Sequence, residues 1–213
     1  DSATNETSSF SGNCRNAGDR DGVDALFTYP FSVIIDLMNS QQLIVSHPIS
    51  RSLKTVNIVS KHASTIYYDS SYGLKYLLQD PSTGNIYVTF NHGVGLYIYQ
   101  SNTFSIITGS TSSGFVEGEL SQLRIEYPAG LVFLSRGTLL VADMNNNGLR
   151  VLDLTTNTSS SICTGVGGHS DGDASSCQLT QPWSLLKEND IVFISGTKYI
   201  RSMMRGRYPS ETW

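Results

Sequence analysis

The chain has 213 residues, a formal net charge of −4, and only 15% charged residues. This acidic balance argues against nucleic-acid binding, which favours strongly basic domains. No apolar run reaches the roughly 20 residues that a membrane helix needs, so we expect any membrane attachment to use an anchor outside this segment. The start at Asp1 lacks the basic and apolar regions of a signal peptide, which predicts a mature or trimmed terminus.

Four short runs of mainly β-branched and aliphatic residues recur along the chain. They begin at residues 43, 86, 139 and 191, so they follow one another at intervals of roughly 43 to 53 residues. An interval of about 40 to 50 residues is typical of one four-stranded blade of a β-propeller. The recurrence therefore predicts four copies of one structural unit.

The flanks of these runs also repeat. An apolar segment precedes each run, and it opens with Pro30, Pro128 and Pro182 in three copies, whereas the second copy has Tyr72-Gly73-Leu74 there. A third alternating strand follows each run, at residues 53–56, 95–98, 149–152 and 199–202, and a fourth is expected at 105–109 and 161–165. Strands at regular spacing, without helical periodicity, predict an all-β propeller.

The predicted architecture is a single propeller domain over residues 1–213. Its blades are expected at about 14–60, 61–109, 110–165 and 166–205. Residues 8–11 resemble the fourth strand of the third copy, because both follow a similar Asn- and Ser-rich stretch. We therefore predict that this N-terminal strand pairs with residues 199–203 and closes the ring. A fragment of a larger ring is the alternative.

The residue pattern of the copies resembles that of the NHL-repeat family, which has an acidic-Gly loop, a Pro, a strand that ends in Val-Ala-Asp, Asn residues and an Arg. The third copy carries this pattern nearly in full: Glu117-Gly118, Pro128, Val141-Ala142-Asp143, Asn145-Asn146-Asn147-Gly148 and Arg150. The fourth copy has Asp171-Gly172 and Pro182, with Ser195 aligned to Asp143, and the first has Asp21-Gly22 and Pro30, with His47 there. The second copy, with Phe90, is the most degraded. We expect Asp143 to accept hydrogen bonds from the following turn or from Arg150.

The resemblance implies a function in recognition, because NHL propellers use the loops of one face as a binding platform. The divergent Ser/Thr-rich copies are also similar to the flagellum-attachment surface glycoproteins of trypanosome-like parasites, which carry extracellular repeats of this kind. The resemblance thus implies a membrane-anchored ectodomain in cell adhesion.

Cysteines and glycosylation sequons favour the secretory pathway. Cys163 and Cys177 flank a Gly-rich loop, and a disulfide between them would contribute roughly 3 kcal/mol. A catalytic cysteine is the weaker alternative, because nothing in the sequence positions His169 beside it. Cys14 has no partner at the equivalent position. Sequons occur at Asn5 and Asn157, so we predict an extracellular glycoprotein.

Two further patterns resemble metal-binding sites, but each is explained more simply as a structural feature. Residues 143–148 match the first half of a calcium loop, but the twelfth position is Leu154 rather than Glu, so we interpret the segment as a turn between strands. His47 and His92 both follow a second strand and are interpreted as turn or surface residues. No metal, cofactor or catalytic residue is predicted.

Tyrosines concentrate in the second copy, and most are expected to fill the space between blades. Tyrosine is also enriched in binding surfaces, because it contributes contact area with few rotatable bonds. Some of these tyrosines are therefore expected at an interface. We predict a partner surface at Tyr67, Tyr68, His92, Asn145 and Asn146.

The sequence thus predicts a non-enzymatic extracellular domain that binds another protein, such as a cell-surface ectodomain, through a propeller face. Two alternatives stay open: a metal-dependent propeller lyase or hydrolase, and a carbohydrate-binding propeller. The lectin alternative requires the same residues in every blade, whereas His47, Phe90, Asp143 and Ser195 differ.

Overall fold

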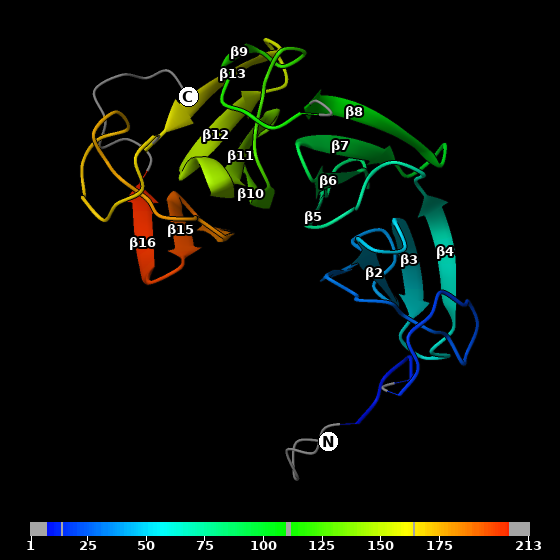
Figure 1. The fold of residues 1–213 in the computed structure, drawn as a ribbon. Coiled ribbons are helices and arrows are strands. Elements are labelled where there is room, and N and C mark those ends of the chain that lie inside the picture. The colour runs from blue at the N-terminus through cyan, green and yellow to red at the C-terminus, as the bar shows by residue number, and fades with distance from the viewer. Residues whose placement is uncertain (1–7, 14, 110–111, 164, 205–213) are drawn as a thin grey trace.

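The computed structural model describes residues 8–13, 15–109, 112–163 and 165–204 of the chain. Four antiparallel sheets are arranged as the blades of a four-bladed β-propeller, and the only helical element among these residues is the short 3-10 helix η1 (Met144–Asn146). Figure 1 shows the sheets following one another along an arc, with β2–β4 at one end and β15–β16 at the other. The predicted all-β propeller is confirmed.

Each sheet is a meander of neighbouring strands. The first contains β1 (Ser32–Ile35), β2 (Gln42–His47), β3 (Ser52–Asn57) and β4 (Ala63–Tyr68). The second contains β5 (Leu77–Gln79), β6 (Ile86–Phe90), β7 (Gly93–Ile98) and β8 (Thr103–Gly109). The third contains β10 (Pro128–Ser135), β11 (Thr138–Asp143), β12 (Gly148–Asp153) and β13 (Thr158–Ile162), extended by β9 (Gly118–Glu119). The fourth contains β14 (Ser184–Glu188), β15 (Ile191–Gly196) and β16 (Tyr199–Met204).

The four recurring runs form the second strand of each sheet, as predicted. This strand has neighbours on both sides, and in β11 all six residues are buried. β-Branched and aliphatic side chains suit such a position, because both faces of the strand pack against other residues. The repeated runs therefore mark the core of each blade.

The first blade is longer than predicted. Its fourth strand, β4, begins at Ala63, beyond the expected boundary at residue 60. Asn57 makes the tight β3–β4 turn, because its Oδ1 accepts hydrogen bonds from the backbone N–H groups of Val59 and Ser60 at 3.0 and 2.8 Å. The sequence of β4 is compatible with a strand, but it lacks the Asn-Thr turn that precedes the fourth strand in the second and third copies.

The predicted closing strand is not formed. Residues 8–11 are outside any strand, and the fourth sheet has the order β14-β15-β16 in the part of the chain that is described. The N-terminal segment lies instead against the first sheet, where the hydroxyl of Ser11 donates a hydrogen bond to the carbonyl of Lys61 at 3.3 Å. Similarity to the fourth strand of another copy was too weak to specify a partner at the far end of the arc.

Apolar side chains fill the spaces between successive sheets. Ile44 and Leu53 of the first sheet pack with Leu77, Ile86 and Val88 of the second. Further along the arc, loops that precede a sheet also enter the space. Three residues of one such loop lie between the second and third sheets (Leu120, Leu123 and Ile125), and Cys177 and Leu179 lie between the third and fourth. The core is therefore a series of interfaces between blades.

An ion pair recurs where the loop before a sheet meets its third strand. Lys54, Arg150 and Arg201 occupy equivalent positions, because each pairs across the sheet with the corresponding residue of the second strand. Their partners are the acidic residues of the acidic-Gly dipeptides: Asp21 at 2.6 Å, Glu117 at 3.5 Å and Asp171 at 3.3 Å. We call this contact the loop ion pair. It gives the acidic-Gly motif a structural role, because it fastens the loop to its own sheet.

The second sheet has no basic residue at this position. Gly95 stands there, and the ring of Phe104 occupies the space beside it, so that a Cβ at Gly95 would lie 2.1 Å from Phe104 Cζ. Phe104 stacks on Tyr67 with 5.1 Å between ring centroids. An aromatic contact between two sheets thus replaces the ion pair in the most degraded copy.

The strand register corrects one alignment. Gly196, rather than Ser195, is equivalent to His47, Phe90 and Asp143, because Ser195 and Ser46 both accept the backbone hydrogen bond at the start of their inner strand, from Trp183 and Phe31. The position still differs in every blade. Within the described residues, no helix has the length and apolar character needed to cross a membrane.

Candidate functional site

A shared turn begins the inner strand of three sheets. Tyr29, Tyr127 and Gln181 have positive φ angles of 56°, 53° and 45°, and each precedes the proline that opens the repeat. Few residues other than glycine adopt this conformation, so the turn is a specific feature of the repeat. It directs the side chains that flank the proline to the same end of each sheet.

A hydroxyl group on the second strand fixes the start of three inner strands. Ser46 Oγ accepts from the N–H of Ser32 at 3.1 Å, and Thr89 Oγ1 accepts from the N–H of Tyr76 at 3.1 Å. Ser195 Oγ accepts from the N–H of Ser184 at 3.3 Å. The aromatic residues beside these bonds are therefore held in place by the backbone.

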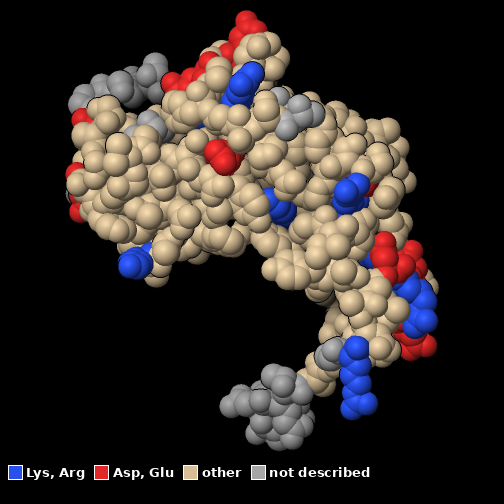
Figure 2. Space-filling view, in the orientation of Figure 1, with Lys and Arg blue, Asp and Glu red and all other residues tan. Residues whose placement is uncertain are grey.

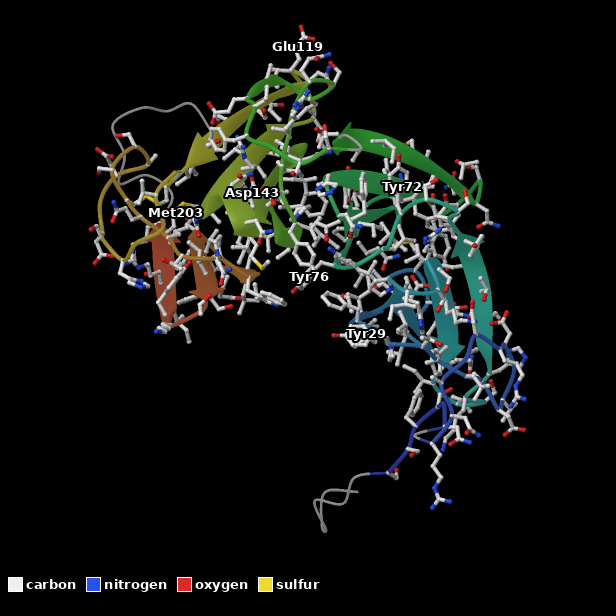
Figure 3. All side chains as sticks on the ribbon, in the orientation of Figure 1. Tyr29, Tyr72, Tyr76, Glu119, Asp143 and Met203 are labelled. Carbon is white, nitrogen blue, oxygen red and sulfur yellow. A yellow bond between two sulfur atoms is a disulfide. The ribbon has the colours of Figure 1, made fainter. Side chains whose placement is uncertain are left out.

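Four aromatic rings at this end of the sheets contact one another in succession, and we call them the aromatic ladder: Tyr29, Phe31, Tyr76 and Trp183. Successive ring centroids are 6.3, 5.0 and 6.4 Å apart, and the last two contacts are edge-to-face, the geometry that aromatic pairs prefer. The ladder connects the first, second and fourth sheets through Tyr76. Figure 3 shows Tyr29 and Tyr76 on the concave side of the arc.

Both ends of the ladder are open to solvent. Tyr29 is 63% exposed and Trp183 is 44% exposed, whereas Phe31 and Tyr76 are half-buried. Figure 2 shows few charged residues along this concave side, and many of the coloured side chains lie at the periphery. The ladder is therefore an accessible, mainly uncharged surface with large rings at both ends.

A buried amine lies next to the ladder. Lys75 is only 4% exposed, and its Nζ lies 3.2 Å from the centroid of the Tyr127 ring, a cation–π contact. Burial lowers the pKa of Lys75 to about 8 and raises the pKa of the neighbouring Tyr76 phenol. The amine of Lys75 is therefore held against an aromatic ring rather than in water.

The predicted partner residues are divided between two places. Tyr67 packs between the first and second sheets, against Phe104 and Tyr97, and its hydroxyl donates to Asp69 at 2.8 Å. Tyr68 points outward and is exposed. The structure thus gives Tyr67 a packing role and leaves Tyr68 accessible at the outer edge of the first sheet.

The other predicted residues lie on loops at the same end of the sheets as the ladder. His92 is in the β6–β7 turn, and Asn145 and Asn146 are in η1, between β11 and β12. Asn145 is exposed, whereas Asn146 donates to Asp143 Oδ2 at 2.8 Å and to the carbonyl of Gly114 at 2.9 Å. Asn146 therefore organises its loop.

Asp143 is saturated by protein donors. It accepts from Arg150 Nε at 2.8 Å, as predicted, and also from the N–H of Glu126 and from Asn146. Asp143 and Arg150 are both fully buried, and the Arg150 guanidinium also lies 3.7 Å from the centroid of Phe115. These contacts agree with the interpretation of residues 143–148 as a structural turn.

The histidines and cysteines also have defined places. The interpretation of His47 as a turn or surface residue is wrong, because His47 ends β2 and is fully buried, where its ring stacks on Phe27 at 5.1 Å. Burial and the charge of Lys54 lower its pKa to about 4. Among the described residues, no group of three or more His, Cys, Asp or Glu side chains is placed to hold a metal.

The predicted Cys163–Cys177 disulfide is formed. Asn157 is exposed in a turn, whereas Cys14 and Asn5 lie outside the described residues.

Sequence reasoning missed the aromatic ladder and Lys75. A signal was present, since Phe31 and Trp183 both directly follow the repeat proline and Tyr29 directly precedes it. These aromatic residues stand before the strands and so do not contribute to any strand periodicity. Only an alignment of the four repeat copies could have identified them. Tyr76 was counted among the packing tyrosines of the second copy.

Comparison with known proteins supports the fold. No family model matches the chain. A solved auxiliary nutrient binding protein from Bacteroides thetaiotaomicron superposes with a TM-score of 0.65 at 15% identity, over 76% of this chain and 44% of that protein. A streptogramin B lyase superposes with a TM-score of 0.58 at 10% identity, over 83% of this chain and 51% of the lyase. The chain thus spans about half the length of these structures or less.

One curated relative shares sequence over a shorter stretch. The protein SUPPRESSOR OF QUENCHING 1, chloroplastic, from Arabidopsis thaliana is 32% identical in an alignment of 100 residues that covers 43% of this chain and 10% of that protein. The structural neighbours are β-propeller-like proteins, so the propeller is the property that the comparisons establish. A binding protein and a lyase both use this fold, which by itself decides neither activity.

Proposed function

We propose that this propeller is a non-enzymatic extracellular recognition domain that binds another protein through the face carrying the aromatic ladder. The observation that carries the proposal is the exposure of Tyr29 and Trp183 at the two ends of a line of contacting rings. Tyrosine and tryptophan dominate the energetically important positions of protein interfaces, because each buries a large rigid surface at low entropic cost.

The surroundings of the ladder suit a protein partner. Three of the rings stand directly before an inner strand, where backbone hydrogen bonds to the second strand hold Phe31, Tyr76 and Trp183, so little conformational entropy is lost on binding. His92 and Asn145 lie on loops at the same end of the sheets and supply polar groups for the rim of an interface. An apolar centre with a polar rim is the usual anatomy of a recognition surface.

The proposed location is the cell surface or the secretory pathway. The Cys163–Cys177 disulfide is typical of an oxidising compartment, and the exposed Asn157 sequon could accept a glycan there. The partner would then be another ectodomain, and the biological role would be adhesion. Attachment to a membrane would require an anchor outside residues 1–213.

Surface plasmon resonance against a panel of recombinant cell-surface ectodomains tests the proposal. Tyr29→Ser and Trp183→Ser should each weaken binding to a panel member about tenfold or more, since interface anchors contribute at least 1.4 kcal/mol. Val59→Ser is the control, because Val59 is 74% exposed in the β3–β4 turn, at the end of the sheet opposite the ladder. Equal binding by all three variants would contradict the ladder as the contact surface.

A carbohydrate ligand is the second candidate, because exposed aromatic rings also stack on the apolar faces of sugars. The same variants decide between the two on a glycan array. Binding of a glycan that depends on Trp183 would favour the carbohydrate, and a silent array together with ectodomain binding would favour the protein. Stoichiometric zinc or calcium in the purified protein would instead favour the metal-dependent enzyme alternative.

A further inference from the structure

The outer face of the fourth sheet exposes residues that are buried in every other blade. Leu53, Val94 and Leu149 are equivalent residues of the third strands and are all 0% exposed. Their equivalent in the fourth sheet is Ile200, which is 80% exposed. The equivalence follows from the strand register, since each residue pairs with the penultimate position of its second strand.

Neighbouring residues on this face show the same contrast. Leu186 and Phe193 pair across β14 and β15, as Val132 and Leu140 do across β10 and β11. The pair in the third sheet is buried against the fourth sheet, whereas Leu186 and Phe193 are exposed. Soluble monomers rarely expose contiguous apolar sheet faces of this kind. We call this face, with Leu186, Phe193, Ile200 and Met204, the trailing face.

The first sheet exposes the complementary side. Leu77, Leu131 and Leu185 are equivalent residues of the inner strands, and each is at most 8% exposed because it packs toward the preceding sheet. Their equivalent in the first sheet is Val33, which is 59% exposed. Ile35 lies two residues along the same face and is 57% exposed. We call this side, with Val33 and Ile35, the leading face.

The two faces are built to meet each other. At each internal interface, the trailing side of one sheet packs on the leading side of the next, with the loop before the later sheet filling part of the space. The leading face of the first sheet already carries such a loop, because Ala25 packs on Val45, Val56 and Ala63. Within one molecule these two faces lie at opposite ends of the arc (Figure 1), so among the described strands neither face packs on another sheet.

We propose that a second copy of this chain covers both faces, so that the trailing face of one copy packs on the leading face of the other. Such a heterologous contact forms a ring when the rotation closes. Two arcs of four sheets would then make eight blades, which is within the range of four to eight found in propellers. A second copy is the occupant because one chain exposes both kinds of face that pack on each other at its internal interfaces.

Analytical ultracentrifugation of the 213-residue protein tests the proposal. The wild type should sediment as a dimer. Ile200→Asp and Val33→Asp should each weaken self-association at least about tenfold, because each places a charge in both apolar contacts of the ring. Both residues are exposed in the single copy, so circular dichroism should show an unchanged fold. Val59→Asp is the control, since Val59 is 74% exposed and lies in the β3–β4 turn.

Mixing the two variants identifies the kind of contact. The Ile200→Asp copy keeps an intact leading face and the Val33→Asp copy keeps an intact trailing face. The mixture should therefore form a one-to-one heterodimer through the single contact that carries no aspartate, and should associate more tightly than either variant does with itself. A dimer that persists in either single variant would indicate like faces in contact and overturn the proposal. A wild type that stays monomeric, or a mixture that stays monomeric, would also overturn it.

Discussion

The third and fourth sheets use the same loop ion pair in very different surroundings. In the third sheet, Arg150 is fully buried and is held by Glu117, by the buried Asp143 and by the ring of Phe115. In the fourth sheet, the side chain of Arg201 is 17% exposed and its partner Asp171 is 94% exposed. One repeat position therefore holds a buried ionic cluster in one blade and a surface contact in another.

The difference teaches that burial, rather than the motif, sets the energy of the contact. Water and salt screen a surface ion pair, which contributes at most about 1 kcal/mol. A buried pair gains little in net terms, but removal of one partner leaves the other charge without compensation. The first sheet is intermediate, because the second carboxylate on its buried Lys54 is Asp19, which is 40% exposed, whereas the second carboxylate on Arg150 is the fully buried Asp143.

The largest effect is expected from Arg150→Met. It leaves the carboxylate of Asp143 buried without its ion-pair partner, and the loss should be about 3–5 kcal/mol of unfolding free energy. Urea denaturation measures this loss, and Arg136→Met at an exposed site is the control. The double variant with Asp143→Leu should recover much of the stability. A loss below about 1 kcal/mol in the single variant would contradict a buried ionic cluster.

The second sheet replaces the ion pair by aromatic packing, and Gly95→Ala tests that replacement. The new Cβ would lie 2.1 Å from Phe104 Cζ, and the ring cannot withdraw freely because it stacks on Tyr67. We expect a loss of about 1–3 kcal/mol from overpacking, measured by thermal unfolding. Phe104→Leu in the same chain should relieve the clash. An unaffected Gly95→Ala protein would show that the ring is free to move.

Asp21→Asn should have a smaller and pH-dependent effect in the first sheet. Burial raises the pKa of Asp21, but hydrogen bonds from Lys54 and Thr65 outweigh it, so the pKa lies below its usual value of 3.8. The carboxylate therefore stabilises the fold above that pH and ceases to do so as the pH falls through the lowered pKa. We expect a loss of about 0.5–1 kcal/mol at pH 7.

The pH dependence distinguishes this charge effect from a loss of packing. The difference between wild type and Asp21→Asn should shrink progressively in acid as the wild-type carboxylate becomes protonated. Denaturation at neutral pH and in acid measures both states. A difference that stays constant across the pH range would mean that the charge of Asp21 contributes nothing.

Asp171→Asn should have the smallest effect. Because Asp171 is almost fully exposed, its contact with Arg201 is screened by water and salt. Arg201 also donates to the carbonyls of Ser170 and Gln178, each at 2.9 Å, and these bonds remain in the variant. The melting temperature should not change beyond experimental error, with or without added salt. A clear, salt-sensitive drop would show that the surface contact is stronger than its exposure implies.

Much of the fold could be predicted from the residues alone. The four second strands, the Cys163–Cys177 pair and the contact between Asp143 and Arg150 follow from local patterns in the sequence. The recurrence of a buried strand at a fixed interval is a strong signal, because each blade must solve the same packing problem. Once these strands are placed, the positions of the residues that flank them in each blade are also defined.

Only the tertiary structure decided which distant segments meet. The closing strand at residues 8–11 was expected from similarity, yet it lies at the first sheet, because pairing depends on the path of the whole arc. The aromatic ladder joins residues from three sheets, and the exposed faces at Val33 and Ile200 appear only when equivalent positions are compared in space. Local sequence therefore determined the blades, whereas the contacts between blades, which depend on their arrangement, determined the candidate binding surfaces.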